Sequence, residues 1–248
     1  MDLNFLGRGA AFNPKEGNTS AFFIENNELF LIDCGENIFE RIINNDLLNG
    51  IEKINLMITH THSDHIGSAG SLIMYFYYRY YKQVNIILPE NALYLPSINK
   101  ILEGFGCDKE MYNFIREKEF DNKYNTFQNI RYVLTKHRRG MNSYSIIFNT
   151  DRGIVYYSGD TKELNTVKTL IESGKPIDKL FIDTTSENYP SNVHLYVGEL
   201  DKVIPSELRD SVYCMHFNND ECIDMAHEFG FNVVEVYNKN NVIRKNAQ

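Results

Sequence analysis

The stretch that decides the fold is His60-Thr61-His62-Ser63-Asp64-His65. It places three imidazoles and a carboxylate in a single turn of chain, one residue beyond residues 54–58, whose mostly apolar side chains indicate a buried strand. Polar groups at such a position need hydrogen-bond partners or a metal ion. Imidazole nitrogens and carboxylate oxygens are ligands that zinc accepts readily. The stretch therefore predicts a metal site at the end of a strand.

Three further polar residues follow short hydrophobic runs elsewhere in the chain. They are His137, Asp160 and His216, and each lies just beyond the apolar residues of a predicted strand. In open α/β sheets the carboxyl edge of the strands is where ligands bind. We therefore expect these residues to supply the ligands that the histidine-rich stretch lacks.

Taken in order, these motifs resemble the metallo-β-lactamase fold and, within it, the ribonuclease Z-like branch. The segments 5–9, 17–21 and 31–36 also match that branch. The five family motifs fall at Asp33, 60–65, His137, Asp160 and His216. The resemblance implies an α/β protein with an αβ/βα four-layer sandwich. We expect one domain over residues 1–248, with a variable helical segment at about 91–128.

Composition restricts the substrate and the compartment. The formal net charge of −8 argues against a grip on long nucleic acid, because proteins that bind a phosphate backbone usually carry a basic surplus. The four cysteines form no C-x-x-C pair, which indicates reduced thiols. We find no basic-then-apolar leader and no apolar stretch long enough to cross a bilayer. The expectation is a cytoplasmic protein without a membrane contact, in the host cytoplasm if a phage encodes it.

The resemblance implies two ligand sets joined by one bridging residue. One metal ion would be held by His60, His62 and His137, the other by Asp64, His65 and His216, with Asp160 between them. Two Zn²⁺ are the expected cofactors, although Mn²⁺ or another divalent metal suits the same ligands. A metal pair of this kind clamps the attacking and leaving oxygens of a phosphoryl group. Asp64 is thus expected to be catalytic as well as a ligand.

Three residues outside the ligand sets are predicted to support the chemistry. Asp33 resembles an outer carboxylate that orients a ligand histidine, and a cap of the next helix is the alternative. His194 resembles a general acid that protonates the leaving oxygen, and a surface histidine at a helix start is the alternative. Glu187 is close in sequence and is expected to hold His194 charged. Leu195 departs from the family, which usually has a small hydroxyl residue there.

Two surface features allow more than one interpretation. Arg138 and Arg139 follow His137 and either contact a substrate phosphate or are solvated loop charges. Residues 75–81 are aromatic at all but one position, so a helix over 66–81 cannot face water on every side. We expect one face to pack on the sheet and the other to contact a second subunit, with a base-stacking wall as the alternative. A homodimer is also what the resemblance implies.

The substrate class follows from the resemblance. The tRNA-processing enzymes of this branch carry a long glycine-rich arm, which this chain lacks. Segment 13–20 is similar to the bacteriophage anti-Pycsar phosphodiesterases and their bacterial relatives, which degrade cyclic mononucleotide messengers. We therefore expect a phosphodiesterase that converts 3′,5′-cyclic mononucleotides to 5′-monophosphates. The alternatives are a tRNA 3′-processing endonuclease, a non-cleaving nucleotide-binding protein, and a thioester or lactam hydrolase of the same fold.

Overall fold

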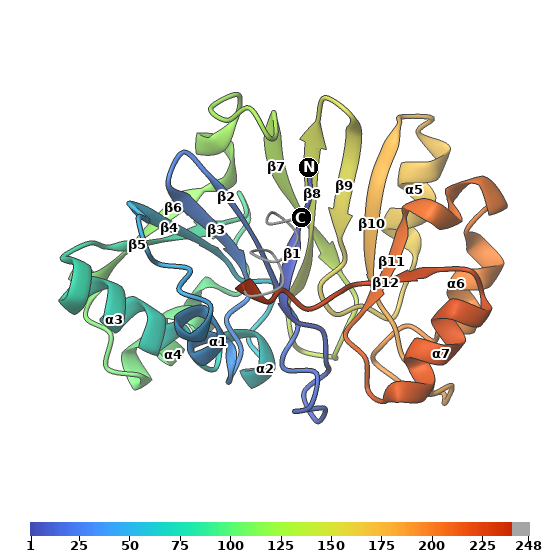
Figure 1. Cartoon of the computed structure of the whole chain (residues 1–248), viewed down its shortest axis with the longest axis horizontal. Helices are drawn as coiled ribbons and strands as arrows, with labels where there is room; N and C mark the ends of the chain where they lie inside the picture. Colours follow the sequence, from blue (N-terminus) through green and yellow to red (C-terminus); the bar gives the residue numbers. More distant parts are fainter. Residues whose placement is uncertain (240–248) are drawn as a thin grey trace.

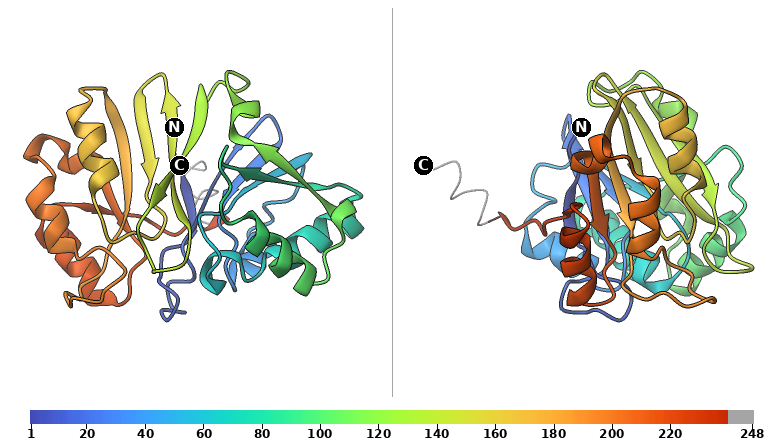
Figure 2. Two further views of the ribbon diagram at one scale, coloured as in Figure 1. Left: turned by 180° about the vertical axis from the view of Figure 1, so that it is seen from behind. Right: turned by 90° about the vertical axis from the view of Figure 1, so that its right-hand side faces the viewer.

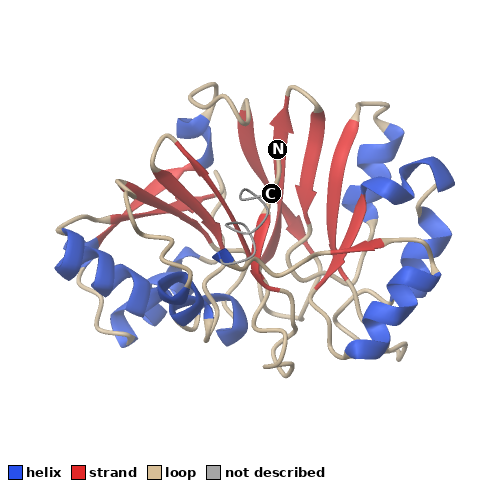
Figure 3. Ribbon diagram, viewed as in Figure 1, coloured by secondary structure: helices blue, strands red, loops and turns tan. Residues whose placement is uncertain are grey.

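The computed structural model describes residues 1–239, which form two six-stranded sheets facing each other with helices outside (Figures 1 and 3). The first sheet has the strand order β1 (Asn4–Gly7), β2 (Ser20–Glu25), β3 (Glu28–Ile32), β4 (Lys53–Met57), β5 (Val84–Leu88) and β6 (Tyr112–Arg116). The second has the order β12 (Asn232–Val233), β11 (Val212–Met215), β10 (Ile177–Asp183), β9 (Gly153–Tyr157), β8 (Ser143–Thr150) and β7 (Asn129–Thr135).

Helices cover the outer face of each sheet, as Figure 2 also shows from behind and from the side. On the first sheet they are α1 (Ile38–Asn44), α2 (Ser63–Ile66), α3 (Ala69–Tyr80) and α4 (Leu95–Gly104). On the second they are α5 (Asn165–Glu172), α6 (Val197–Val203) and α7 (Asp220–Glu228). Short 3₁₀ turns occupy η1 (Lys109–Met111), η2 (Glu117–Phe120) and η3 (Ser206–Ser211). The predicted αβ/βα sandwich is confirmed.

The space between the sheets is filled by large aromatic side chains. Phe30 and Phe148 are fully buried there, and the rings of Phe23 and Phe30 stack with centroids 4.6 Å apart. Burying one such side chain contributes about 1.5–3 kcal/mol to folding. This aromatic layer forms the core between the two sheets.

Strand direction brings the polar motifs to one edge. Strands β3, β4, β5 and β6 run parallel, as do β9, β10, β11 and β12. The carboxyl ends within each group therefore lie at one edge of their sheet, near the bottom of Figure 1. Helices and loops cross between parallel strands, so the residues directly after each strand meet there.

The helix expected over 66–81 is interrupted. It divides into α2 and α3 because Ser68 contacts the loop after β3: its N–H donates to the Cys34 carbonyl at 3.0 Å, and its hydroxyl donates to the Gly35 carbonyl at 2.5 Å. Phe76 of α3 is fully buried, whereas Tyr78 is 63% exposed and Tyr81, just beyond the helix, is 89% exposed. One face of the aromatic helix thus packs inward and the other meets solvent.

The segment 91–128 is helical only in part, which corrects the prediction. It contains α4, η1 and η2, but also β6, which pairs in parallel with β5 from Val84↔Tyr112 to Leu88↔Arg116. As an edge strand, β6 is mostly solvent-exposed, so its residues show little of the apolar pattern that marks a buried strand.

None of the helices in residues 1–239 is long and apolar enough to cross a membrane.

Candidate metal centre

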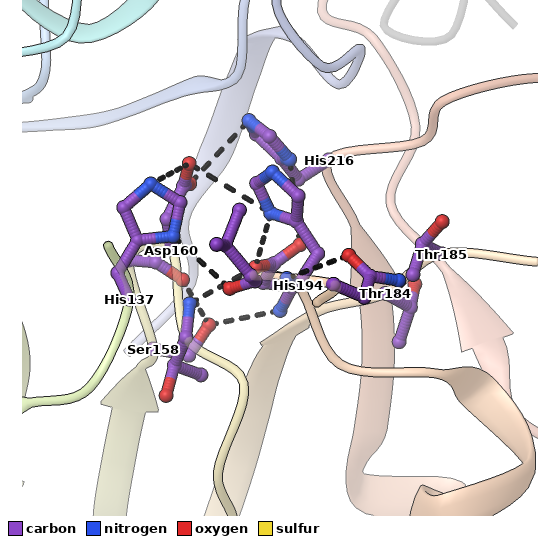
Figure 4. Close-up of polar contacts among 12 residues, drawn as sticks. His137, Ser158, Asp160, Thr184, Thr185, His194 and His216 are labelled. Atoms are coloured by element: carbon purple, nitrogen blue, oxygen red, sulfur yellow. Dashed lines mark hydrogen bonds and ion pairs between the residues drawn. The ribbon is translucent and has the colours of Figure 1, made fainter. Parts of the chain in front are cut away.

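The histidine-rich stretch forms a tight turn at the end of β4. Helix α2 begins right after His62, whose carbonyl accepts the N–H groups of His65 at 3.0 Å and Ile66 at 3.1 Å. This turn curls the chain so that His60, His62 and His65 face a common space. His137, Asp160 and His216 reach the same space from other strand ends. Figure 4 shows these three side chains near one another, together with His194.

Three imidazole nitrogens converge to form the first cluster, which we define as His60, His62, His137 and Asp160. Nδ1 of His62 lies 3.0 Å from Nε2 of His60 and 3.1 Å from Nε2 of His137. Oδ2 of Asp160 lies 3.6 Å from the same His60 atom and 3.7 Å from that of His137. All four side chains except that of His62 are buried.

The second cluster consists of Asp64, His65, Asp160 and His216. Nε2 of His65 lies 3.2 Å from Oδ2 of Asp64 and 3.1 Å from Oδ1 of Asp160. Nε2 of His216 lies 3.3 Å and 3.4 Å from the same two oxygens. Asp160 therefore turns one carboxylate oxygen toward each cluster. The structure brings together all seven residues that the sequence predicted as ligands.

The two clusters have different electrostatics. Burial lowers the pKa of His60, His62 and His137, so these imidazoles are neutral and expose lone pairs to one another. In the second cluster burial again opposes charge on the imidazoles, but the carboxylates of Asp160, Asp183 and Asp64 together outweigh burial and raise the pKa of His216 to about 10. The buried carboxylates thus require positive charge beside them, whether from protons or from a cation.

These donors fit divalent metal ions. Nε2 of His65 is buried without a hydrogen-bond partner among the described residues, and the three nitrogens of the first cluster face one another. A zinc ion bound tetrahedrally at about 2.0–2.1 Å places its ligand nitrogens about 3.3 Å apart, close to the separations seen here. Imidazole and carboxylate ligands suit zinc and also other first-row divalent metals.

Asp33 lies directly behind the ligands. Its Oδ1 accepts the backbone N–H of Thr59 at 2.7 Å, while Oδ2 accepts the Thr59 hydroxyl and Nδ1–H of His65, both at 2.8 Å. The N-cap of the next helix, α1, is Asn37. The capping alternative for Asp33 is therefore wrong, and its carboxylate contacts a ligand histidine.

His194 lies beside both clusters. Its ring centroid is 5.0 Å from that of His137 and 4.9 Å from that of His216 (Figure 4). Nδ1 of His194 lies 2.9 Å from Oδ2 of Asp183, the last residue of β10. The carboxylate paired with His194 is therefore Asp183, while the Glu187 side chain is exposed, so the prediction that Glu187 holds His194 is wrong. Burial opposes charge on His194, but Asp183 and Asp160 together outweigh burial and raise the pKa of His194.

The loop that carries His194 also contacts the first cluster. The carbonyl of Val193 accepts Nδ1–H of His137 at 3.0 Å, which directs Nε2 of that ring toward the cluster. Asn192 stabilises the loop, because its Oδ1 accepts the His194 N–H at 3.0 Å and its Nδ2 donates to the Glu187 carbonyl at 2.7 Å. Leu195 is buried in the core beneath the second sheet, which explains an apolar residue at that position.

Arg138 and Arg139 lie in the exposed loop after His137. Neither guanidinium makes a hydrogen bond or an ion pair within residues 1–239.

The sequence analysis did not identify Asp183, although a signal for it was present. Residues 180–182 are apolar and Asp183 follows them, just as the predicted metal ligands follow apolar strands. The sequence analysis also missed the side chain of Thr59 and the carbonyl of Val193.

Comparison with known proteins gives consistent matches along the chain. A sequence model of the family described as "Anti-Pycsar protein Apyc1" matches residues 1–236. The anti-Pycsar protein Apyc1 of Saccharibacillus brassicae is 29% identical over 232 residues, which cover 89% of this chain and 91% of the relative.

Solved structures show the same fold at low sequence identity. The metallo-β-lactamase fold protein YhfI from Bacillus subtilis superposes with a TM-score of 0.68 at 15% identity, covering 96% of both chains. The short form of human tRNase Z gives 0.64 at 18% identity, covering 96% of this chain and 98% of the other. The chain therefore has the metallo-β-lactamase fold.

Proposed function

The chain belongs to the family of the anti-Pycsar protein Apyc1, and from this membership we propose that it is a metal-dependent phosphodiesterase that hydrolyses 3′,5′-cyclic mononucleotides. The proposed products are 5′-monophosphates. The proposed biological effect is to remove the cyclic-nucleotide signals of antiphage defence. The observation that carries the reaction type is His194, which lies beside both ligand clusters with Asp183 against its Nδ1.

We infer that the two clusters hold two divalent metal ions. One would be bound by His60, His62 and His137, the other by Asp64, His65 and His216, with Asp160 shared. Zn²⁺ fits these donors best, and Mn²⁺ or another divalent ion suits them as well. When bound, such a pair supplies Lewis acidity toward a phosphoryl group and lowers the pKa of nearby water.

His194 is proposed to protonate the leaving group. Its Nδ1 faces Asp183, so Nε2 remains to give a proton to the 3′ oxygen as the phosphorus–oxygen bond breaks. Asp183 raises the pKa of His194 against the opposing effect of burial, so the charged form persists to higher pH than in a free imidazole. A leaving alkoxide needs such a donor, whereas thioester hydrolysis releases a thiolate, which has less need of one.

A small substrate suits the surface of this protein. The net charge of −8 does not favour a long polyanion. Arg138 and Arg139 are exposed beside the first cluster and have no ion-pair partner within residues 1–239. We propose that they contact the single phosphate of a cyclic mononucleotide. Because metals and arginines would hold mainly the phosphate, we expect tolerance toward different bases.

We also propose a homodimer that forms through the exposed face of α3. Around Tyr78 lies a cavity of about 390 Å³ whose wall is mostly apolar and includes Phe39, Met74 and Tyr75. Tyrosine is favoured at protein interfaces because its ring is apolar and its hydroxyl tolerates water.

The substrate proposal can be tested with purified, zinc-loaded protein. It is incubated with a panel of 3′,5′-cyclic mononucleotides and with a precursor tRNA, each with and without chelator. Release of 5′-monophosphates that chelator abolishes, with the tRNA intact, is the expected result. Cleavage of the tRNA alone would instead identify a processing endonuclease. Tight binding of cyclic nucleotides without any product would identify a nucleotide-binding protein.

A further inference from the structure

We propose that the hydroxyl of Thr59 is a positioning group that fixes the ring of His60 and thereby connects Asp33 to both ligand clusters. Thr59 follows β4 and is fully buried. Its Oγ1 lies 2.8 Å from Oδ2 of Asp33 and 3.1 Å from Nδ1 of His60. The inference rests on the metal centre proposed above and assigns a role to a residue outside both ligand sets.

The direction of these hydrogen bonds follows from counting protons. A hydroxyl has one hydrogen, so it donates to only one of its two neighbours. The Asp33 carboxylate takes that hydrogen: its Oδ1 accepts the Thr59 N–H at 2.7 Å and its Oδ2 accepts the Thr59 hydroxyl at 2.8 Å. The Thr59 hydroxyl therefore donates to Asp33 and accepts Nδ1–H of His60.

This arrangement selects one tautomer of His60. With its proton on Nδ1, the ring presents the unprotonated Nε2 to the first cluster. That Nε2 lies 3.0 Å from Nδ1 of His62 and 3.6 Å from Oδ2 of Asp160. Metal-binding histidines are generally held by such a partner on the other ring nitrogen, and losing the partner typically weakens metal binding 10–100-fold.

Thr59 gives His60 the kind of Nδ1 neighbour that three other ligand histidines have. Nδ1 of His65 contacts Asp33 directly, Nδ1 of His137 contacts the Val193 carbonyl, and Nδ1 of His216 lies 3.3 Å from Asp183. His60 reaches Asp33 only through the Thr59 hydroxyl. One carboxylate thus orients a ligand in each cluster, directly in the second and through Thr59 in the first.

The remainder of the Thr59 side chain holds the hydroxyl in place. A Cβ built on Gly159, which has φ of 56°, would lie 3.2 Å from the Thr59 methyl, so the methyl packs close to the backbone just before Asp160. The Thr59 N–H donates to Asp33, and its carbonyl accepts the Tyr144 N–H at 3.0 Å. Valine would keep this packing and remove only the hydroxyl, whereas serine would keep the hydroxyl.

The test measures metal binding, not turnover. Metal-free wild-type protein, Thr59→Val, Thr59→Ser and His62→Ala are titrated with Zn²⁺ in competition with a chromophoric chelator. We expect two equivalents in the wild type and in Thr59→Ser. In Thr59→Val one equivalent should bind roughly 10–100-fold more weakly, and it should be the equivalent that His62→Ala loses.

Two results would overturn the inference while leaving the proposed function in place. They are wild-type affinity for both equivalents in Thr59→Val, or an equal loss in Thr59→Ser and Thr59→Val. A wild-type protein that binds no metal would overturn the proposed function itself, and this inference with it. If Thr59→Val does not fold by circular dichroism, Thr59→Ala removes the hydroxyl without placing a methyl against Asp33, and the same comparison applies.

Discussion

Nδ1 of His194 lies 2.9 Å from Oδ2 of Asp183, and the other oxygen of that carboxylate lies 3.3 Å from Nδ1 of His216. Asp183 is fully buried, and the Thr161 N–H also donates to its Oδ2 at 2.9 Å. Burial opposes its ionisation, but His194 and His216 outweigh burial and lower its pKa, so the carboxylate is charged at neutral pH. A single carboxylate therefore orients both the proposed acid and a proposed metal ligand.

Replacing Asp183 with asparagine should slow catalysis while preserving the shape of the site. We expect kcat for a cyclic mononucleotide to fall by roughly 10–100-fold, because His194 loses the charge that supports its protonated form. Steady-state kinetics and metal analysis of the same samples check this, since Asp183 also faces His216.

The matched control for this prediction is Glu187→Gln. The Glu187 side chain is exposed, so its replacement should leave kcat within about twofold of the wild type, like most surface substitutions. An equal loss in the two variants would mean that Asp183 has no special connection to His194.

Removing the imidazole of His194 should reduce the rate of hydrolysis most for substrates with a poor leaving group. His194→Ala should lower the rate on a cyclic mononucleotide by roughly 100-fold or more, the usual scale for a lost general acid. A nitrophenyl phosphodiester, whose leaving group needs no proton, should lose much less. Parallel kinetics on the two substrates check this, and equal losses on both would show that His194 is not the acid.

The ligand set was expected from the family resemblance, and the strand pattern supports it: His60, His137, Asp160 and His216 each lie just beyond a different apolar strand, and His62, Asp64 and His65 continue the turn after β4. Parallel strands bring these ends to one edge, so His60, His137 and His216 meet without any knowledge of the loops between them. Asp183 carries the same local signal, but sequence reasoning assigned Glu187, and not Asp183, as the partner of His194. The contact with His194 forms only when the loop 184–193 folds back, which depends on long-range contacts such as Val193 with His137.

Two features of the fold could not be predicted from the local sequence: strand β6 and the break between α2 and α3. Strand β6 is set by parallel pairing with β5, a contact between segments about 28 residues apart that a mostly exposed edge strand does not signal. The break between α2 and α3 comes from Ser68 bonding to the Cys34 and Gly35 carbonyls, an alternative that serine offers to a continuing helix. In both places tertiary contacts decide the local structure.

Asp64→Ala should abolish nearly all turnover and leave the fold largely intact. The Asp64 carboxylate, in α2, contacts His65 and His216 instead of packing in the apolar core, so its loss mainly removes a metal ligand. Circular dichroism should be unchanged, and metal analysis should show less bound metal than in the wild type. Wild-type turnover in this variant would contradict the ligand assignment.

Glu28 should contribute stability that disappears in acid. Burial opposes its ionisation, but hydrogen bonds from Lys53, Asn55 and Tyr124 outweigh burial and lower its pKa. Because its pKa is lower in the folded than in the unfolded protein, the contribution is present above about pH 4.5 and is lost as the pH falls through the folded pKa.

The variant Glu28→Gln isolates this contribution. Its free energy of unfolding should be about 1–2 kcal/mol below that of the wild type at pH 7, and the difference should shrink as the pH approaches 3. Urea unfolding of both proteins at several pH values, in metal-free buffer, measures it. A difference that stays constant with pH would mean that the Glu28 charge is not the source.

Tyr78→Glu should separate the proposed dimer. The ring of Tyr78 is 63% exposed on α3, where a partner subunit would bury it. A glutamate at this position would bury a charge in the dimer contact and should weaken association by at least tenfold. Ile24→Glu is the control, because Ile24 is 48% exposed on β2, away from α3. Light scattering should show a dimer for the wild type and Ile24→Glu and a monomer for Tyr78→Glu. A monomeric wild type would refute the dimer. A dimeric Tyr78→Glu would show that the dimer contact lies on another surface, because an unpaired charged side chain is not tolerated inside a buried contact.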